Sequence, residues 1–273
     1  MMSSPTSLLR SASAAFAAAV TLGAASSALA AGQYGFQDRD VSRVISIGGA
    51  CVRCELSGRR LTGANFIGAN FSSATLVGSD LRGTTITGSD FSNVDFTRAD
   101  LRGASLVGTS FVSADFTQAR LDGVEAHGAH FSEADLTGAN LSGAELFGAD
   151  FSEADATGAN FSGAELRGAN LAEGDFTRAS FADASLMSAR MSEADFSSAN
   201  FAGADLTRAD IRGADFSGAR GLTQSQINMA CGNEDTQLPR GLSVRSCRGP
   251  SAPPRPPAPP SAPRQVMVMA GGN

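Results

Sequence analysis

Large apolar residues recur at every fifth position through most of this chain. From Leu56 to Phe216 the pattern runs through 33 five-residue words without a change of register. Two residues before each large residue, here called the centre of its word, stands a small residue, usually alanine. Two residues after the centre stands glycine in 19 of the 33 words. Helices and flat strands have side-chain periods of about 3.6 and 2 residues. A period of five therefore predicts a chain that bends once in every word, with glycine supplying the backbone freedom.

The words also repeat in groups of four. Residues 131–150 read FSEADLTGANLSGAELFGAD, and residues 151–170 match them at 16 of 20 positions. Centres twenty residues apart share a character: one column is aromatic, whereas the column that begins at Phe66 is otherwise aliphatic or alanine. The aromatic column consists of Phe71, Phe91, Phe111, Phe131 and Phe151. Identity at this spacing predicts a coil of four words, with successive coils lying directly above one another.

These words resemble the A-(D/N)-L-x-x unit of the pentapeptide-repeat family over residues 54–220. The resemblance implies an all-β solenoid, a right-handed quadrilateral β-helix with centres and small residues inside and the other three positions outside. About eight coils, at about 4.8 Å per layer, give a rod of roughly 40 Å.

Two centres are undersized, Ala126 and Ala156. The preceding small position largely restores the volume at the first, because it is Val124. Nothing near Ala156 does so. We therefore expect a small void at Ala156, or a shifted Phe176 from the next layer, and a higher melting temperature for Ala156→Leu.

Four shorter segments flank the array. Residues 1–30 read as a secretory signal peptide: Arg10, an alanine-rich apolar stretch, and an A-x-A cleavage pattern between Ala30 and Ala31. Residues 31–53 are the expected N-terminal cap, and residues 221–248 a C-terminal cap. In the latter, Thr223 and Gln226 form a capping-box pattern that opens a short helix, and Gly232 is placed to end it. Four apolar residues can cover the last coil: Leu222, Ile227, Met229 and Leu238.

Residues 249–273 are a proline-rich tail with P-x-x-P spacings, expected to be polyproline II or disordered. A solvated spacer and a docking peptide are both compatible with this composition. No segment has the roughly 20 consecutive apolar residues that a membrane span needs.

An even number of cysteines in an exported chain suggests disulfides. Because the two ends of the rod are roughly 40 Å apart, only Cys51–Cys54 and Cys231–Cys247 can meet, and a four-cysteine zinc site is excluded in a monomer. We expect structural disulfides. The spacing of Cys51 and Cys54 also matches redox motifs, but no thioredoxin-like pattern surrounds it.

The repeat body is anionic. Residues 55–220 hold 23 acidic side chains and 12 arginines, a net charge of −11, and the chain has no lysine. Direct nucleic-acid binding is therefore not expected. One row stands out: Glu133, Glu153, Glu173 and Glu193 recur every twenty residues, as a stripe for a cation or a basic partner or as a passive product of duplication.

No nucleophile and base come together in the pattern. The two histidines, His127 and His130, occupy outward positions, and with Glu125 they could bind a metal weakly, although surface residues are the simpler interpretation. We expect no enzyme activity, cofactor or metal.

The sequence thus predicts a non-catalytic, exported scaffold in the periplasm or outside the cell that presents an acidic surface to a protein partner. The alternative comes from the resemblance. Some pentapeptide-repeat proteins mimic duplex DNA and occupy DNA gyrase, a type II topoisomerase, and the −11 body suits that role if the chain is cytoplasmic.

Overall fold

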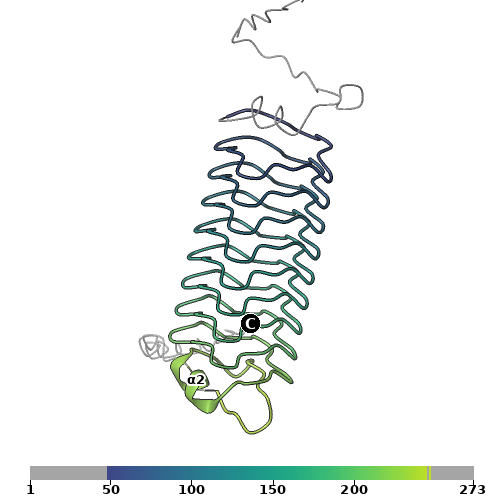
Figure 1. Cartoon of the computed structure of the whole chain (residues 1–273). Helices are drawn as coiled ribbons and strands as arrows, with labels where there is room; N and C mark the ends of the chain where they lie inside the picture. Colours follow the sequence, from purple (N-terminus) through teal and green to yellow (C-terminus); the bar gives the residue numbers. More distant parts are fainter. Residues whose placement is uncertain (1–47, 245, 247–273) are drawn as a thin grey trace, which may run out of the picture.

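The computed structural model describes residues 48–244 and 246, which form a rod of stacked coils (Figure 1). Parallel β-bridges join residues twenty apart at every word from Ala50–Asn70 to Asn200–Arg220. One coil is therefore four words, as the doubled unit predicted, and the four-sided β-helix is confirmed. Continuous strands are not needed, because each word contributes one bridge residue, directly before its centre, to one side of the rod.

Every word contains one tight turn. In most words the N–H three residues after a centre donates to the carbonyl of that centre, as from Ala64 to Leu61 at 3.0 Å. The residue two after the centre has a positive φ in each of these turns, and fifteen such residues are not glycine. A left-handed backbone costs a side-chain-bearing residue about 1–2 kcal/mol. The glycines of the pattern therefore reduce backbone strain, and each exception carries a local cost.

The polar residue before each centre has a structural role in the turn. Its Asp or Asn side chain accepts a hydrogen bond from the backbone N–H two residues on, for example Asp135 from Thr137 at 2.8 Å and Asn70 from Ser72 at 2.9 Å. Such side chains offer the turn an acceptor that water would otherwise supply. The recurrence of Asp and Asn therefore has a structural reason.

Phenylalanine rings stack in columns inside the rod. The ring centroid of Phe131 lies 5.0 Å from that of Phe111 and 4.8 Å from that of Phe151, with the rings nearly parallel. Beyond Phe151 this column continues with Leu171, and stacked rings appear on the opposite side of the rod as Phe161, Phe181 and Phe201. The coil at 151–170 is thus where the aromatic stack changes sides.

Ala156 is the centre between the two columns at this change. The rings of Phe151 and Phe161 contact edge to face, with centroids 5.7 Å apart. In the next layer, Cε2 of Phe176 lies 2.7 Å from the point that a methyl group on Gly174 would occupy. Two rings thus meet in the coil where Ala156 has only a small side chain. The ring of Phe176 occupies the space that a side chain at position 174 would take.

The contact between the rings of Phe151 and Phe161 favours the opposite effect of Ala156→Leu. Three additional carbon atoms must displace rings that already touch, and overpacking of this kind costs about 1–3 kcal/mol. We expect a lower melting temperature in a thermal scan, with Ala182→Leu, at an outward and partly exposed position, as the control. A higher melting temperature for Ala156→Leu would show that the void expected from the sequence is present.

The N-terminal limit of the array differs from the expected residue 54. The N–H of Gly48 donates to the carbonyl of Ile67 at 2.9 Å, and Ala50 already forms a bridge with Asn70. Cys51 occupies a centre position and is buried. Residues 48–53, which were expected to belong to the N-terminal cap, are therefore part of the first described coil.

The C-terminal end is closed by helix α2, Gln224–Met229 (Figure 1). Thr223 is its N-cap and forms the predicted capping box with Gln226. The buried Gln226 also donates from Nε2 to the carbonyls of Phe201, at 2.8 Å, and Ala204, at 2.9 Å. These carbonyls belong to the last coil, so one side chain both starts the helix and covers the exposed backbone beneath it.

Two expectations for this cap were wrong. The helix ends at Met229 with Ala230 as an extended C-cap, so Gly232 does not end it. A Cβ atom at Gly232 would lie 2.2 Å from Cγ2 of Val244, and close packing is therefore the reason for glycine there. Met229 is 45% exposed and does not cover the core, whereas Ile227 is fully buried. Leu222 and Leu238 are partly buried against the core, as predicted.

Candidate functional site

The predicted glutamate row lies on one edge of the rod. Glu133, Glu153, Glu173 and Glu193 are all exposed, and each occupies the left-handed position of its turn, with φ between 58° and 62°. The glutamates belong to a column of residues twenty apart in which no residue from Arg53 to Glu193 is glycine. In the corresponding column two residues after the Phe66 centres, every residue from Gly68 to Gly168 is glycine. This edge therefore carries side chains where the backbone favours glycine.

A second acidic column runs beside the first. Two residues after each glutamate stands an aspartate in the bridge position, because the words read SEAD or EGD. We call these two columns together the acidic strip; it comprises Glu133, Glu153, Glu173, Glu193, Asp135, Asp155, Asp175 and Asp195. The aspartate column extends further, through Asp95 and Asp115 before the strip and Asp215 after it. Sequence reasoning missed this column, although the repeated E-x-D spacing could have revealed it.

Charge is segregated around the rod. The glutamate edge lies between two sides of the rod, one whose centres are in register with Phe131 and one whose centres are in register with Leu136. Within residues 55–220, the words on these two sides hold 15 acidic residues and 4 arginines. Words on the other two sides hold 8 acidic residues and 8 arginines. The whole net charge of −11 therefore falls on two adjacent sides.

Inside the strip, the glutamates have few partners. Glu133 accepts a hydrogen bond from the hydroxyl of Ser113 at 3.0 Å. Neighbouring charges about 5 Å apart in water repel by roughly 0.8 kcal/mol before salt screening. Among the residues that the structure describes, the carboxylates of Glu153, Glu173 and Glu193 accept no hydrogen bond and form no ion pair, so they can meet a cationic partner.

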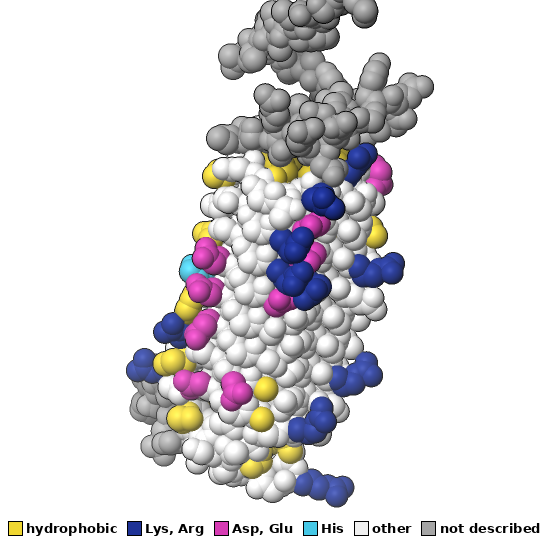
Figure 2. Space-filling view, in the orientation of Figure 1, with side chains coloured by type: hydrophobic (Ala, Val, Ile, Leu, Met, Phe, Trp, Pro, Cys, Tyr) yellow, Lys and Arg dark blue, Asp and Glu magenta, His cyan; other side chains and the backbone are white. Residues whose placement is uncertain are grey.

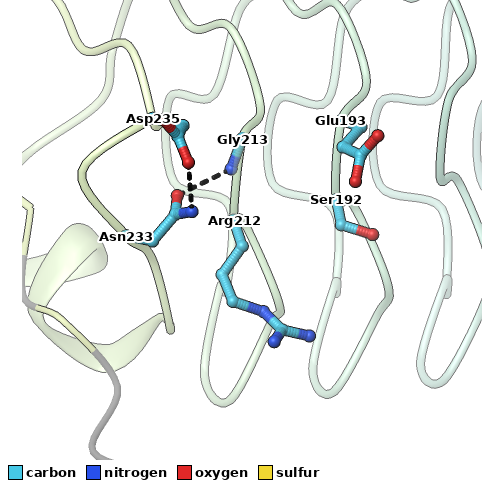
Figure 3. Close-up of a pocket in the computed structure, with 6 residues that line it drawn as sticks. All are labelled: Ser192, Glu193, Arg212, Gly213, Asn233 and Asp235. Atoms are coloured by element: carbon cyan, nitrogen blue, oxygen red, sulfur yellow. Dashed lines mark hydrogen bonds between the residues drawn. The ribbon is translucent and has the colours of Figure 1, made fainter. Parts of the chain in front are cut away.

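An open hollow lies at the C-terminal end of the strip (Figure 3). It is lined by Ser192, Glu193, Arg212, Gly213, Asn233 and Asp235. The Oδ1 atom of Asn233 accepts from the N–H of Gly213 at 2.9 Å, and its Nδ2 donates to Asp235 at 2.9 Å. Arg212 donates to Asp210. The polar groups that line the hollow are thus largely engaged in hydrogen bonds, including the one that holds the C-terminal cap onto the last coil.

The two histidines do not form a metal site with Glu125. His127 lies 3.1 Å from Glu145 through Nε2 and packs edge to face on Phe147, over which Arg167 also lies, 4.6 Å from the ring centroid. Within residues 48–244, no group of three or more His, Cys, Asp or Glu is arranged to hold a metal ion. No helix in the described part of the chain is long and apolar enough to cross a membrane.

The first predicted disulfide is present. Cys51 and Cys54 are bonded, with Cα atoms 5.3 Å apart. Cys231 is also disulfide-bonded. Its predicted partner Cys247 lies outside the described residues, as do the signal peptide, the cleavage site at Ala30 and Ala31, and the proline-rich tail.

A ladder of ion pairs occupies another side of the rod, where acidic and basic side chains alternate near the N-terminal end (Figure 2). Arg82 donates to both carboxylate oxygens of Asp80 at 2.8 Å, and this pairing lowers the pKa of Asp80 to about 2. The pairing of Arg102 with Asp100 likewise lowers the pKa of that carboxyl group.

The ladder predicts a small acid-dependent loss of stability. The pKa of Asp80 is about 2 in the folded protein and about 3.9 in an unfolded chain. Its contribution is therefore complete above about pH 4 and is lost as the pH falls toward 2. Because Arg82 is half exposed, we expect Asp80→Asn to cost less than about 1 kcal/mol at pH 7.

In urea titrations, the difference between wild type and Asp80→Asn should disappear near pH 2. Asparagine keeps the turn hydrogen bond, as Asn70 does. The matched control is Asp115→Asn, since Asp115 bonds the N–H of Thr117 but forms no ion pair among the described residues. A difference at pH 7 that persists at pH 2 would contradict this assignment.

Comparison with known proteins agrees with this geometry. The family model for pentapeptide repeats matches eight copies over residues 51–88, 89–125, 127–163, 144–183, 164–201 and 189–220. The chain therefore belongs to the pentapeptide-repeat family, whose fold is a right-handed β-helix.

Solved structures of the same family are similar to the chain. HetL from the cyanobacterium Nostoc, a protein involved in the regulation of heterocyst differentiation, is 29% identical over 71% of this chain and 92% of its own, with a TM-score of 0.34. A thylakoid-lumen protein of Arabidopsis thaliana is 28% identical over 55% and 79%, with a TM-score of 0.29.

The fluoroquinolone resistance protein QnrB1 is 20% identical over 70% of this chain and 92% of its own, with a TM-score of 0.39. A comparison with curated proteins gave no significant match. The family assignment rests on the repeats and on the coils that they form.

Proposed function

We propose that this protein is a non-catalytic scaffold that binds a basic protein partner through the acidic strip, after export to the periplasm or the cell exterior. The observation that carries the proposal is the concentration of the whole −11 charge on two adjacent sides of a rigid rod. A potential of one sign over an extended face attracts and orients an oppositely charged partner.

The backbone positions of the glutamates favour a binding role for the acidic strip over a passive product of duplication. Four glutamates stand at positions where glycine would relieve a strain of about 1–2 kcal/mol each. The side chains extend from a backbone that is bridged to the layers above and below, so their spacing along the rod is fixed before binding. A preformed backbone lowers the entropic cost of association.

Export rests on the N-terminal thirty residues and on the cysteines, which suit an oxidising compartment. The measurement is the mature N-terminus by mass spectrometry together with cell fractionation. A chain beginning at Ala31 in the envelope fraction is expected, and an intact Met1 in the cytoplasm would overturn this part of the proposal.

The strip can be tested with a peptide of alternating arginine and alanine as the probe. Converting Glu133, Glu153, Glu173 and Glu193 to glutamine should weaken binding at least tenfold in calorimetry at low salt. The matched control neutralises four acids of another side, Glu125, Glu145, Glu165 and Asp205, and should change affinity less than threefold. Equal losses in both variants would show that net charge alone attracts the probe and would overturn the strip.

A second candidate is a DNA-mimicking ligand of a type II topoisomerase, favoured by the −11 charge of the rod. Export argues against it, because gyrase is cytoplasmic. Inhibition of gyrase supercoiling by residues 31–273 at stoichiometric amounts would favour this candidate. Absence of inhibition would exclude it, and the scaffold would remain as the candidate function.

A further inference from the structure

The disulfide at the N-terminal end of the described rod takes the place of ordinary packing. Cys51 stands where most other words have Phe or Leu, and Cys54 stands where most have Ala. The turn brings these two inward positions together, since the N–H of Cys54 donates to the carbonyl of Cys51 at 3.2 Å. The same turn recurs in every word, yet in residues 48–219 only this word carries a covalent link.

The link lies beside solvent. Cys51 is buried, but Cys54 is only partly buried, and the two residues between them, Val52 and Arg53, are exposed. The bond therefore has a route of attack for a thiolate from solvent.

Opening the bond would affect one layer only. The word is attached to the second coil by backbone hydrogen bonds from Cys51 to Asn70, at 2.7 Å, and from Arg53 to Ser72, at 3.0 Å. From Leu61 onward, the core is continuous and its centres are at most 2% exposed. Because stability in a repeat array is a sum over neighbouring layers, an end can open without the middle.

We infer that Cys51–Cys54 is a redox-responsive closure of the first coil, opened by small or protein dithiols while the rest of the rod remains folded. In the reaction, a dithiol thiolate attacks one sulfur and releases the other as a thiolate. Its second thiol then attacks the mixed disulfide, which leaves Cys51 and Cys54 reduced and the reagent oxidised to a disulfide. Two electrons pass from the reagent to the protein.

The test is hydrogen exchange with and without dithiothreitol on the full chain, with alkylation and mass spectrometry reporting each cysteine separately. We expect Cys51 and Cys54 to become alkylated under conditions in which the circular dichroism of the rod is unchanged. Amide exchange at residues 48–58 should accelerate at least tenfold, while residues 71–200 should not change.

A Cys51→Ala/Cys54→Ala variant should show the fast exchange without reductant and no further change with it. A Cys231→Ser variant separates any effect of the other disulfide and should respond like the wild type. Resistance of Cys51–Cys54 to reduction until the rod unfolds, or reduction with no change in exchange at residues 48–58, would overturn the inference.

Discussion

Replacing Phe131 by alanine is expected to lower the free energy of unfolding by about 3–5 kcal/mol. The ring of Phe131 is fully buried and stacks between Phe111 and Phe151. It also contacts the edge of Phe116 at a centroid distance of 5.7 Å. The substitution therefore removes contacts to both neighbouring layers, in the middle of the rod where no end can relax to fill the cavity.

Urea unfolding followed by circular dichroism measures this effect. Phe147→Ala is the matched control, because Phe147 is an outward, partly exposed phenylalanine in the same coil, in contact with His127 and Arg167. Its loss should cost less than about 1.5 kcal/mol. Similar costs at the two positions would contradict the assignment of inward and outward positions.

Gln226→Leu is expected to be the most damaging substitution in the C-terminal cap. Leucine has a similar volume, but it removes the amide that now serves the carbonyls of Phe201 and Ala204. The carbonyl of Phe201 still accepts from the N–H of Ala204 at 3.1 Å, whereas the carbonyl of Ala204 loses its side-chain donor. An unsatisfied buried acceptor costs about 1–3 kcal/mol. The substitution also removes one half of the capping box, the hydrogen bond from the N–H of Thr223 to the side chain of Gln226.

The thermal midpoint and the oligomeric state after heating report this loss, because an uncovered coil end offers backbone groups to another molecule. Gln237→Leu is the control, since Gln237 bridges to Asp215 through its backbone and its side chain is exposed. A stable monomeric Gln226→Leu variant would show that the helix, and not this amide, closes the rod.

Most of the coil geometry could be predicted, because it follows from strictly periodic residues. The positions of Leu56, Phe131 and Ala134 inside the rod need only the word and its twenty-residue register. The capping box at Thr223 was equally readable, since its hydrogen bonds join residues three apart in the chain.

What could not be predicted depends on contacts between layers. The rings that meet around Ala156 approach from opposite sides of the coil, so the local word gave no sign of them. Gln226 reaches carbonyls more than twenty residues earlier, and the exposure of Met229 depends on which face of the helix lies on the last coil. The aspartate column was hidden for a different reason: aspartate is so frequent in the words that its alignment beside the glutamates becomes visible only in three dimensions.

The twenty-residue coil also determines how such a rod can change in length. A duplication of one whole coil, like that of residues 131–150 and 151–170, adds a layer and leaves every column and both ends as they were. An insertion of a single word would preserve each turn and each inward side chain, but it would rotate everything after it by one side. Every column, including the two acidic ones, would then break at the point of insertion. The fold tolerates either event, and the strip tolerates only the first.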